Sequence, residues 1–484
     1  MYITKGAEQI LDQTNFLWEM IRSELEDAVG RENVDCSLAG KLIHGVDCFW
    51  LSLMNVATRK TPPLPEFIVR PGSDDEVMKV LKIANYYKIP VTPFGGASGS
   101  QGGCLPVAGG ISLDMKRMNR VLEFDEFSHT ITVEAGINFQ QLEWIANERG
   151  YSLMHYPSAL TCGTVGGFLA HNGIGVLSTK YGRIQDQCLA LEMATPGAGI
   201  IKTAPVPKHS SGPDIKGMCI GSEGTYGVFT KATFQLFKQP EVRYFRGFLF
   251  PNLHCAIEAG RKMLEEFKPS ILRMYDEAET KSIIRKIVGV EQPGCFMNIA
   301  VEGMKAIADI ELERACAISK ECGGEDMGSE YGEKWWETKV TFFYPGHMFC
   351  YPKMYGTMDT VATFSQIEKI YWAMKHAVED NFPGVEFIAH FSHWYEWGCM
   401  MYDRFIVERA PEDPEEALRL HNEIWNVGVR AALENGGVVN DHHGVGIKLG
   451  RLMKEQYGPS MAVFQALKKE LDPNGIMNPF KMGV

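Results

Sequence analysis

Three glycine-rich segments are places where the backbone itself could bind a ligand. The first follows the strand-like run IPVT and holds five glycines in nine residues, from Gly95 to Gly103. Glycine accepts positive φ and lets the chain approach a ligand closely, so consecutive free N–H groups can cradle a pyrophosphate without a lysine. The alternative for this segment is a flexible surface loop.

Two common phosphate motifs do not fit that loop. No lysine follows it, as a P-loop requires, and another strand pattern comes where a Rossmann fingerprint needs a helix. The other two glycine segments, residues 163–175 and 221–225, offer further backbone donors at strand ends. Three such segments within one domain suit a long dinucleotide better than a single phosphate.

The elements that must position these loops form a mixed pattern of helices and strands. Up to a proline-rich boundary near residue 64, apolar residues recur at three- and four-residue spacing, which predicts helix. Short strands then alternate with helices such as 72–88, which has an Asp-rich first turn and an amphipathic body. Later strands alternate with longer helices. We therefore predict an α+β fold in four parts, at residues 1–64, 65–240, 241–430 and 431–484.

Bulk composition narrows the function classes. A chain of 484 residues needs more than one core, and its net charge of −12 disfavours a nucleic-acid partner. Its twelve cysteines include no C-x-x-C pair, so an iron–sulfur cluster or structural zinc is not indicated. Without a secretion signal or a run of about twenty apolar residues, we expect a soluble cytoplasmic protein with reduced cysteines and no membrane span.

Several motifs together resemble the vanillyl-alcohol oxidase and para-cresol methylhydroxylase family of FAD proteins. The segments that carry the resemblance, in the family's order, are Ile68–Ser73, Pro93–Gly96, Ile111–Asp125, Val133–Gly136, Thr164–Gly167, Tyr181–Gly182, Gly221–Thr233 and Asp472–Pro479. The resemblance implies a two-part FAD-binding domain at residues 65–240 and an α+β substrate or cap domain at 241–430. Residues 431–484 would then complete the flavin site.

The same resemblance implies that the cofactor is FAD rather than NAD. The first glycine loop would hold the pyrophosphate, the second would line the pyrophosphate and isoalloxazine, and the third would back the adenosine side. The residues expected to bind FAD are Pro93, Gly95, Gly96, Ala97, Ser98, Gly99, Ser100, Thr164, Gly166, Gly167, Asn172, Gly173, Glu223, Gly224, Gly227 and Val228.

Segments of the second half resemble two branches of this superfamily. Asp441–Gly446 (DHHGVG) is similar to the S-H-H-H-G-V-G of alkyldihydroxyacetonephosphate synthases and to the G-E-H-G-I-G of glycolate- and D-lactate-dehydrogenase-like flavoproteins. Pro269–Asp276 and His390–Phe405 also resemble synthase segments, and Tyr402 falls where the synthases carry a catalytic tyrosine. This chain departs from the synthases at Asp441, where they have the first of three histidines.

These residue types suit proton transfer beside a flavin. His442 and His443 precede glycine in a turn, and histidine titrates near neutral pH, so it can take a hydroxyl proton while flavin N5 accepts hydride. Tyr402 could serve as an acid or an orienting donor, and Arg273 could clamp a carboxylate or phosphate. The alternative for adjacent histidines is hydrogen bonding within the turn. We expect these four residues to form the catalytic set.

Two further features leave alternatives open. No metal is expected, although His390, His393 and His442, with His443, could hold zinc or iron. Aromatic residues gather in the second half and indicate either an aromatic substrate pocket or core packing. They are Trp335, Trp336, Phe342, Phe343, Tyr344, Phe349, Tyr351, Tyr355, Trp394, Tyr395 and Trp397.

The favoured function is an FAD-dependent dehydrogenase that removes hydride from an alcohol, hydroxy acid or benzylic or phenolic substrate. The alternative is a synthase-like enzyme that forms or cleaves an ether without net redox change. A third reading is a flavin-holding subunit of an electron-transfer complex. We expect a small-molecule substrate, a homo-oligomer and a separate electron acceptor such as an iron–sulfur protein, the last by analogy alone.

Overall fold

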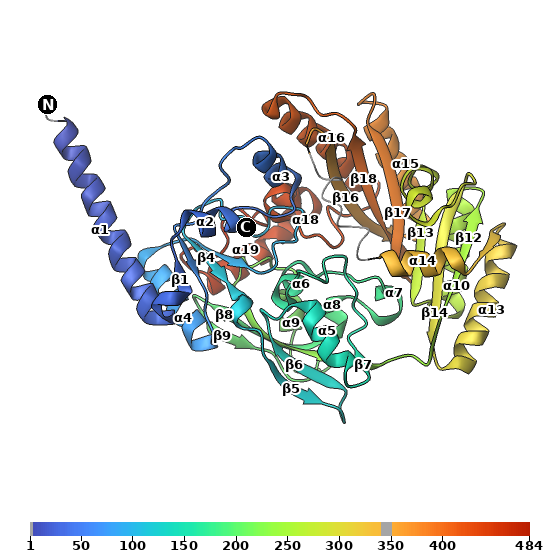
Figure 1. Ribbon diagram of the computed structural model, residues 1–484, viewed down its shortest axis with the longest axis horizontal. Helices are drawn as coiled ribbons and strands as arrows, with labels where there is room; N and C mark the ends of the chain where they lie inside the picture. The colour runs from blue at the N-terminus through green and yellow to red at the C-terminus, as the bar shows by residue number, and fades with distance from the viewer. Residues whose placement is uncertain (1–2, 340–350) are drawn as a thin grey trace.

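The N-terminal part is a long helix followed by short elements. The computed structural model describes residues 3–339 and 351–484, with side chains from Phe16 onward. Helix α1 (Ile3–Val29) projects from the body (Figure 1), and its second half packs through Ile21, Leu25 and Val29. The sequence predicts helix throughout this part, and the structure adds a short strand to it. The elements are β1 (Val34–Asp35), α2 (Leu38–His44) and α3 (Trp50–Ala57).

A small four-stranded sheet carries the first glycine loop. Strands β2 (Phe67–Val69), β4 (Ile111–Asp114) and β3 (Val91–Phe94) are parallel, and β1 pairs antiparallel with β2 at the edge. Helix α4 (Asp74–Tyr87) covers this sheet. Its first turn is acidic, as the sequence predicts, and its N-cap Ser73 accepts a hydrogen bond from the Glu76 N–H, which satisfies one free donor of that turn. The glycine loop leaves the carboxyl end of β3.

A five-stranded antiparallel sheet forms the second half of this part. Its order is β5-β6-β10-β8-β9. The strands are β5 (Val121–Asp125), β6 (Thr130–Glu134), β8 (Cys188–Thr195), β9 (Gly199–Lys202) and β10 (Val228–Gln235). Helices α5 (Phe139–Asn147) and α6 (Val165–His171) pack with it into one core. The second and third glycine segments lie at α6 and just before β10.

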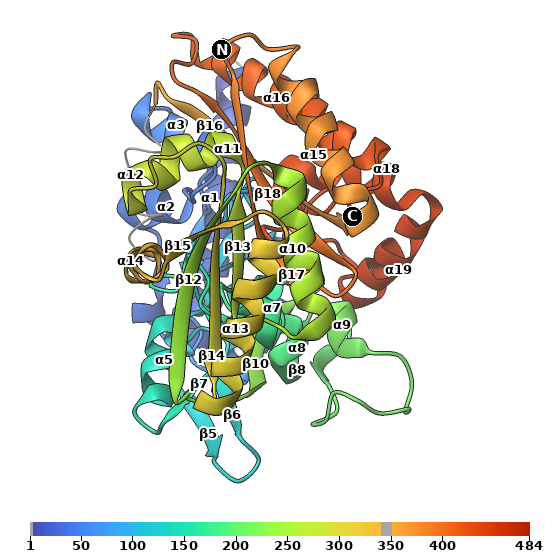
Figure 2. The same ribbon diagram turned by 90° about the vertical axis from the view of Figure 1, so that its right-hand side faces the viewer.

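The second half of the chain is built on a seven-stranded antiparallel sheet of order β15-β12-β14-β13-β17-β18-β16. The strands are β12 (Val242–Phe250), β13 (Ile271–Tyr275), β14 (Cys295–Gly303), β15 (Glu325–Gly328), β16 (Met354–Thr363), β17 (Glu386–Tyr395) and β18 (Gly398–Val407). Its helices include α10 (Leu253–Glu266), α13 (Lys305–Glu321), α14 (Glu330–Thr338), α15 (Phe364–Glu379) and α16 (Pro414–Glu434). In Figure 2, α10 and α13 lie side by side in front of the strands.

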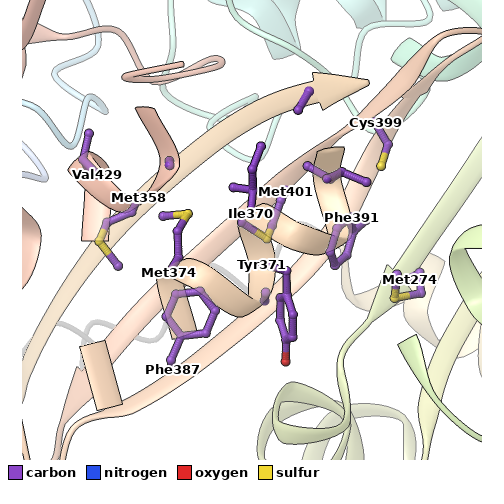
Figure 3. Packing of buried hydrophobic residues seen from close by; sticks show 14 of the residues in the cluster. Met274, Met358, Ile370, Tyr371, Met374, Phe387, Phe391, Cys399, Met401 and Val429 are labelled. Carbon is purple, nitrogen blue, oxygen red and sulfur yellow. The ribbon is translucent and has the colours of Figure 1, made fainter. Parts of the chain in front are cut away.

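One face of this sheet is an apolar core. Strand residues such as Met274, Met358 and Met401 pack there against Ile370 of α15 and Val429 of α16 (Figure 3). Because side chains alternate along a strand, the residues between them point to the opposite face. That opposite face carries the polar side chains considered below.

The C-terminal segment returns to the first half of the molecule. It contains α17 (Gly446–Leu449), α18 (Met453–Tyr457) and α19 (Met461–Leu471). Beyond α19, Met477 forms a bridge with Val91 of β3, and the Asn478 N–H donates to the Val91 carbonyl over 2.8 Å. The end of the chain thus lies beside the first glycine loop. No helix in the described ranges is long and apolar enough to cross a membrane.

Candidate functional site

The first glycine loop presents unused backbone donors. Among the described residues, none accepts a hydrogen bond from the N–H groups of Gly96 to Ser100. Ala97 has a φ of +50°, which turns the chain so that neighbouring amides can converge on an anion. Gly96 lies against the next glycine segment, and a Cβ there would come 2.0 Å from the Cys162 carbonyl oxygen. The loop is therefore held in place on one side and open on the other.

The three glycine segments converge on one cleft with about 950 Å³ of empty space. Thr164 caps α6 by accepting from the Gly167 N–H over 3.3 Å, and the Glu223 N–H donates to the Ala170 carbonyl at the end of that helix. The expected residues that line the cleft are Pro93, Gly95, Gly96, Ala97, Ser98, Gly99, Thr164, Gly166, Gly167, Glu223, Gly224, Gly227 and Val228.

Three residues of the expected set do not line this cleft. The Ser100 hydroxyl oxygen is buried without a partner among the described residues, and Gly173 donates its N–H to the Phe168 carbonyl over 3.0 Å. Asn172 ends α6 with a φ of +53° and donates its side-chain amide to Gln185 over 3.0 Å. It lines a second cavity of about 750 Å³, which lies on the other side of the 440–445 turn.

Sequence reasoning missed several residues of the cleft wall. They are Phe94, Gln101, Gly103, Cys104, Met115, Ala135, Gly163, Phe168, Ala170, His171, Phe229 and Asn478. Phe94, Met115, Ala135, Phe229 and Asn478 lie inside the motifs that carry the family resemblance, so the motifs did contain the signal. His171 and Phe168 lie in the second glycine segment, which was expected to line the cofactor, but within α6 no local pattern singles them out as the residues that face it.

The turn at residues 440–445, which carries His442 and His443 and is called the histidine turn below, reaches the same cleft. His443 lines it, and its imidazole Nδ1 lies 2.7 Å from Oδ1 of Asp359 in β16. His442 follows the same carboxylate, with Nδ1 3.1 Å from Oδ2 and its backbone N–H donating to Oδ2 over 2.9 Å. The two imidazole rings are 4.0 Å apart between centroids. Asp359, which sequence reasoning did not select, thus holds both histidines.

A row of side chains crosses the seven-stranded sheet on the polar face. Register pairs Tyr275 with His390, His390 with Tyr402, and Tyr402 with Asp359. Directly paired residues project from the same face, so the four side chains lie next to one another. The His390 ring stacks on Tyr402 with centroids 4.6 Å apart, and Tyr402 lies edge-on to His443 at 5.1 Å. The row leads from the interior of the sheet to the cleft.

Arg273 enters this row from β13. It is 6% exposed, and it donates from Nε to the Tyr275 hydroxyl and from Nη2 to His390 Nε2, each over 2.7 Å. No described carboxylate lies within ion-pair distance of it, whereas Arg404 nearby is paired with Glu279. The structure therefore brings the four expected catalytic residues, Arg273, Tyr402, His442 and His443, into one cluster.

The environments of the paired histidines differ. Burial opposes the charged form of His442, but attraction by Asp359 and Asp441 outweighs it and raises its pKa to about 9. Burial lowers the pKa of His443, and the charge of His442 adds to this, against the attraction of Asp359. Near neutral pH one ring of the pair is charged and the other is neutral. Such a split is typical of acid–base sites.

Burial shifts the pKa of Tyr402 upward and the pKa of His390 downward. Burial, followed by the neighbouring Tyr355, raises the pKa of Tyr402 well above its usual 10, and the two hydroxyl oxygens are 3.0 Å apart. Burial and the charge of Arg273 hold the pKa of His390 well below its usual value. Tyr402 therefore remains a hydroxyl and His390 a neutral imidazole at neutral pH.

In the alternative metal set, hydrogen bonds already occupy ring nitrogens of His390 and His393. Both nitrogens of His390 are occupied, by Arg273 and by Glu279, and His393 Nε2 lies 2.6 Å from the Gly175 carbonyl oxygen. The ligand-type atoms that do lie together, within 4.8 Å, are those of Asp359, His442 and His443. Hydrogen bonds from the two imidazoles to the carboxylate account for this grouping, and we assign no metal to it.

The aromatic residues divide between core and site. Trp394 is buried in the core beneath the seven-stranded sheet, and Trp335 is buried with its indole N–H donating to the Tyr275 hydroxyl over 2.6 Å. Tyr395 and Trp397 stack on each other at 4.8 Å. Phe342, Phe343, Tyr344 and Phe349 lie outside the described residues.

Comparison with known proteins identifies the family. Residues 239–482 match the model of the C-terminal domain of FAD linked oxidases, and residues 65–204 match the FAD binding domain. The chain belongs to the FAD-linked oxidase family. It is therefore an FAD enzyme, and the resemblance and the α+β fold class predicted from the sequence are confirmed.

Relatives of this FAD-linked oxidase carry different activities. The alkyldihydroxyacetonephosphate synthase of Trypanosoma brucei brucei is 26% identical over 497 residues, covering 95% of this chain and 80% of that protein. The uncharacterized FAD-linked oxidoreductase YgcU of Escherichia coli strain K12 is 29% identical over 442 residues, covering 86% and 89%. The mitochondrial D-lactate dehydrogenase [cytochrome] of Arabidopsis thaliana is 28% identical over 439 residues, covering 87% and 74%.

Solved structures share the fold. An alkyldihydroxyacetonephosphate synthase has a TM-score of 0.80 at 24% identity, covering 96% of this chain and 86% of that one. A p-cresol methylhydroxylase with substrate bound has a TM-score of 0.77 at 18% identity, covering 96% of both chains. The cleft also fits FAD on its own chemistry, because the free amides of Gly96 to Ser100 are the donors that a pyrophosphate needs.

Proposed function

We propose that this protein is a dehydrogenase that oxidises the hydroxyl-bearing carbon of a small hydroxy acid. The observation that carries the proposal is the position of His443, which lines the cleft made by the glycine loops and is oriented by a buried carboxylate. Bound FAD would supply the two-electron acceptor for the hydride. The protein's own part is to bind the substrate and to take its hydroxyl proton.

His443 suits the role of general base. Its Nδ1 donates to Asp359, which leaves the Nε2 lone pair available on the side without a described protein partner. Its lowered pKa keeps the ring neutral at pH 7, so it can accept a proton. Tyr402, edge-on to this ring and still protonated, would donate a hydrogen bond that orients the substrate oxygen.

Arg273 supports an acidic substrate. A buried guanidinium normally has a carboxylate partner, and among the described residues the hydrogen-bond partners of Arg273 are only Tyr275 and the neutral His390. Glu279 is engaged by Arg404, so the row keeps an uncompensated positive charge. A substrate carboxylate would neutralise it through charge-assisted hydrogen bonds.

A synthase-type reaction is the second candidate, and the likeness to alkyldihydroxyacetonephosphate synthase over 95% of the chain favours it. The same cluster would then bind a phosphate at Arg273, and the enzyme would form or cleave an ether without net redox change. Asp441, which is paired with Arg183 over 3.0 Å, stands where the synthases have a histidine and argues for the dehydrogenase.

Anaerobic spectroscopy with the FAD-loaded protein separates the two. Adding 2-hydroxy acids one at a time should bleach the flavin band near 450 nm (approximate, a property of the cofactor) without any other reactant. Matched compounds that lack the carboxylate should bleach it much more slowly. Bleaching by no hydroxy acid, together with ether exchange in the absence of an electron acceptor, would replace the dehydrogenase with the synthase reading.

We further propose that a separate protein, of the iron–sulfur class, accepts the electrons, because the sequence has no closely spaced cysteines to hold a cluster of its own. A cytoplasmic homo-oligomer remains our expectation for the whole assembly. Light scattering of the purified protein gives the oligomeric state, and activity with artificial electron acceptors compared with oxygen shows whether such a partner is needed.

A further inference from the structure

The side-chain carboxylate of Asp359 holds the histidine turn through several contacts. Its Oδ1 accepts from the Asn440 side-chain amide over 2.8 Å and from His443 Nδ1 over 2.7 Å. Its Oδ2 accepts from the backbone N–H groups of Asp441 and His442 over 3.0 and 2.9 Å, and it lies within ion-pair distance of His442 Nδ1, at 3.1 Å. Four hydrogen-bond donors and one ion-pair contact, all from four consecutive residues, thus converge on one buried carboxylate.

We propose that Asp359 is the positioning residue of this site: it fixes the Nδ1–H tautomer of His443, so that Nε2 faces the cleft as base, and it keeps His442 as the charged member of the pair. This inference rests on the proposed function for the role of His443 as base. The tautomer itself follows from the contacts alone. Asp359 does not line the cleft, so it acts on the chemistry through the two rings and the turn that carries them.

The electrostatics of the carboxylate agree with this geometry. Burial alone would raise the pKa of Asp359, but the two histidines lower it well below its usual 3.8, so the group is ionised. An ionised carboxylate can only accept, which requires both Nδ1 atoms to carry hydrogen. An imidazole with Nδ1–H and no charge has its lone pair on Nε2. One carboxylate therefore determines where the proton lies on each ring.

Several other ionisable groups face the pair and have to be counted. From the turn itself comes Asp441, which is 3.2 Å from His442 Nδ1 and is paired with Arg183. From α6 comes His171, whose Nδ1 is 2.8 Å from the His442 carbonyl oxygen, and from the sheet come His390, His393 and Tyr402. Of these, only Asp441 and Asp359 bear negative charge beside the pair. Of these two carboxylates, Asp359 is the one that contacts both rings.

The chain provides a matched control in Asp403. It is also fully buried, lies on β18 opposite Met358, and points to the apolar side of the sheet, one residue out of phase with Tyr402. Neither of its oxygens has a hydrogen-bond partner in the described chain. Burial raises the pKa of Asp403 well above its usual value, so it is a neutral acid. Replacing it with asparagine changes neither charge nor contact at the turn.

The first test needs no variant. The FAD-loaded protein, labelled with ¹⁵N in its histidine rings, is measured by two-bond ¹H–¹⁵N correlation at neutral pH, with His442→Gln and His443→Gln used for assignment. We expect His443 as a neutral ring protonated at Nδ1 and His442 as an imidazolium. A His443 ring protonated at Nε2, or a pair that is wholly neutral, would overturn the proposal. This result does not depend on which substrate the enzyme oxidises.

The second test compares Asp359→Asn with Asp403→Asn in flavin bleaching by the best hydroxy acid. We expect Asp359→Asn to lower kcat on the order of 10²–10⁴-fold, because the base is no longer held in the reactive tautomer, and to raise KM for an anionic substrate, because His442 loses its charge. Its ¹⁵N spectrum should lose the His442 imidazolium signal, and Asp359→Glu should restore part of both. Asp403→Asn should stay within about twofold of the parent.

The outcomes separate the two proposals. If Asp359→Asn keeps its FAD and its kcat while the tautomers change, the positioning role fails but the dehydrogenase stands. If the parent protein oxidises no hydroxy acid but shows the expected tautomers, the proposed reaction fails and the arrangement of the histidines stands. If Asp359→Asn does not retain FAD, the spectrum of the parent protein still decides.

Discussion

The flavin cleft and the polar face of the seven-stranded sheet are built in opposite ways. Much of the cleft wall is made of backbone amides and small residues from three short glycine segments, each of which lies within about a dozen consecutive residues. The polar face is made of charged and aromatic side chains, one from each of several strands, which meet only through strand register. The cleft is specified locally, whereas the face is specified by the fold.

The two regions also differ in what a substitution would disturb. In the cleft an added methyl group meets backbone at Gly96 and open space at Gly99, so the expected effects are on packing and on cofactor binding. On the polar face each side chain influences the protonation state of its neighbour, so a substitution there is expected to affect catalysis. Variants that affect one region and spare the other therefore test whether the division is real.

The largest effect is expected for His443→Ala. Loss of a general acid–base group typically lowers turnover on the order of 10²–10⁴-fold, and FAD should remain bound because the ring is one side chain in a wall made mainly of backbone. Flavin content is measured by absorbance and kcat by steady-state kinetics. The control is His254→Ala, an exposed histidine of α10 paired with Glu368. Unchanged turnover would remove His443 from the mechanism.

Arg273→Lys should lower kcat/KM for a hydroxy acid by roughly 10- to 100-fold, because a hydrogen bond to a charged group contributes about 1.5–3 kcal/mol. Lysine keeps the charge but loses the planar fork, so the loss should appear mainly in KM. Arg314→Lys, in an exposed pair with Glu266, is the matched control. An equal loss for a substrate without a carboxylate would contradict the assigned role.

Gly96→Ala should act on the cleft alone. Its Cβ would meet the backbone of Cys162 and Gly163 at 2.0 to 2.9 Å, and overpacking of this kind costs about 1–3 kcal/mol, or roughly 5- to 100-fold in FAD affinity. Gly99→Ala is the more selective test of cofactor contact, because no described protein atom lies within 4 Å of its Cβ. Its thermal stability without FAD should equal that of the parent. If FAD affinity is also unchanged, the cofactor does not lie against Gly99.

The pH dependence should show both members of the histidine pair. The base must be neutral, and the pKa of His443 is lowered from its usual 6.5, so kcat/KM should fall only as pH drops below about 6.5. His442 loses its charge as pH rises through about 9, and KM for an anionic substrate should increase there. Because the rings are coupled, the two limbs belong to the pair. A profile flat from pH 5 to 10 would contradict the assignment.

How far the sequence could predict this molecule follows from the same comparison. The glycine motifs identify most of the cleft because their chemistry lies in consecutive residues. Asp359 lies in an unremarkable strand, TMDTVA, and only the pairing of β16 with β18 brings it to the histidines. A bulge between Phe391 and His393 changes the register of β17, which no sequence pattern predicts. Arg273 and Tyr402 were selected through resemblance, whereas His390, which links them, was named only as a possible metal ligand.

The smallest effect is expected where a local motif misled the sequence reasoning. Asn172 lies inside the second glycine segment, yet its φ of +53° ends α6 and turns its amide toward Gln185, away from the cleft. Asn172→Gly keeps the left-handed backbone and loses one hydrogen bond, about 1 kcal/mol of stability or less. FAD affinity should not change.

Thr164→Ala removes an N-cap of about 1 kcal/mol as well, but from the cleft wall, so FAD affinity should fall. Equal FAD affinities for the two variants would mean that lining the cleft does not decide which of these motif residues bind the cofactor.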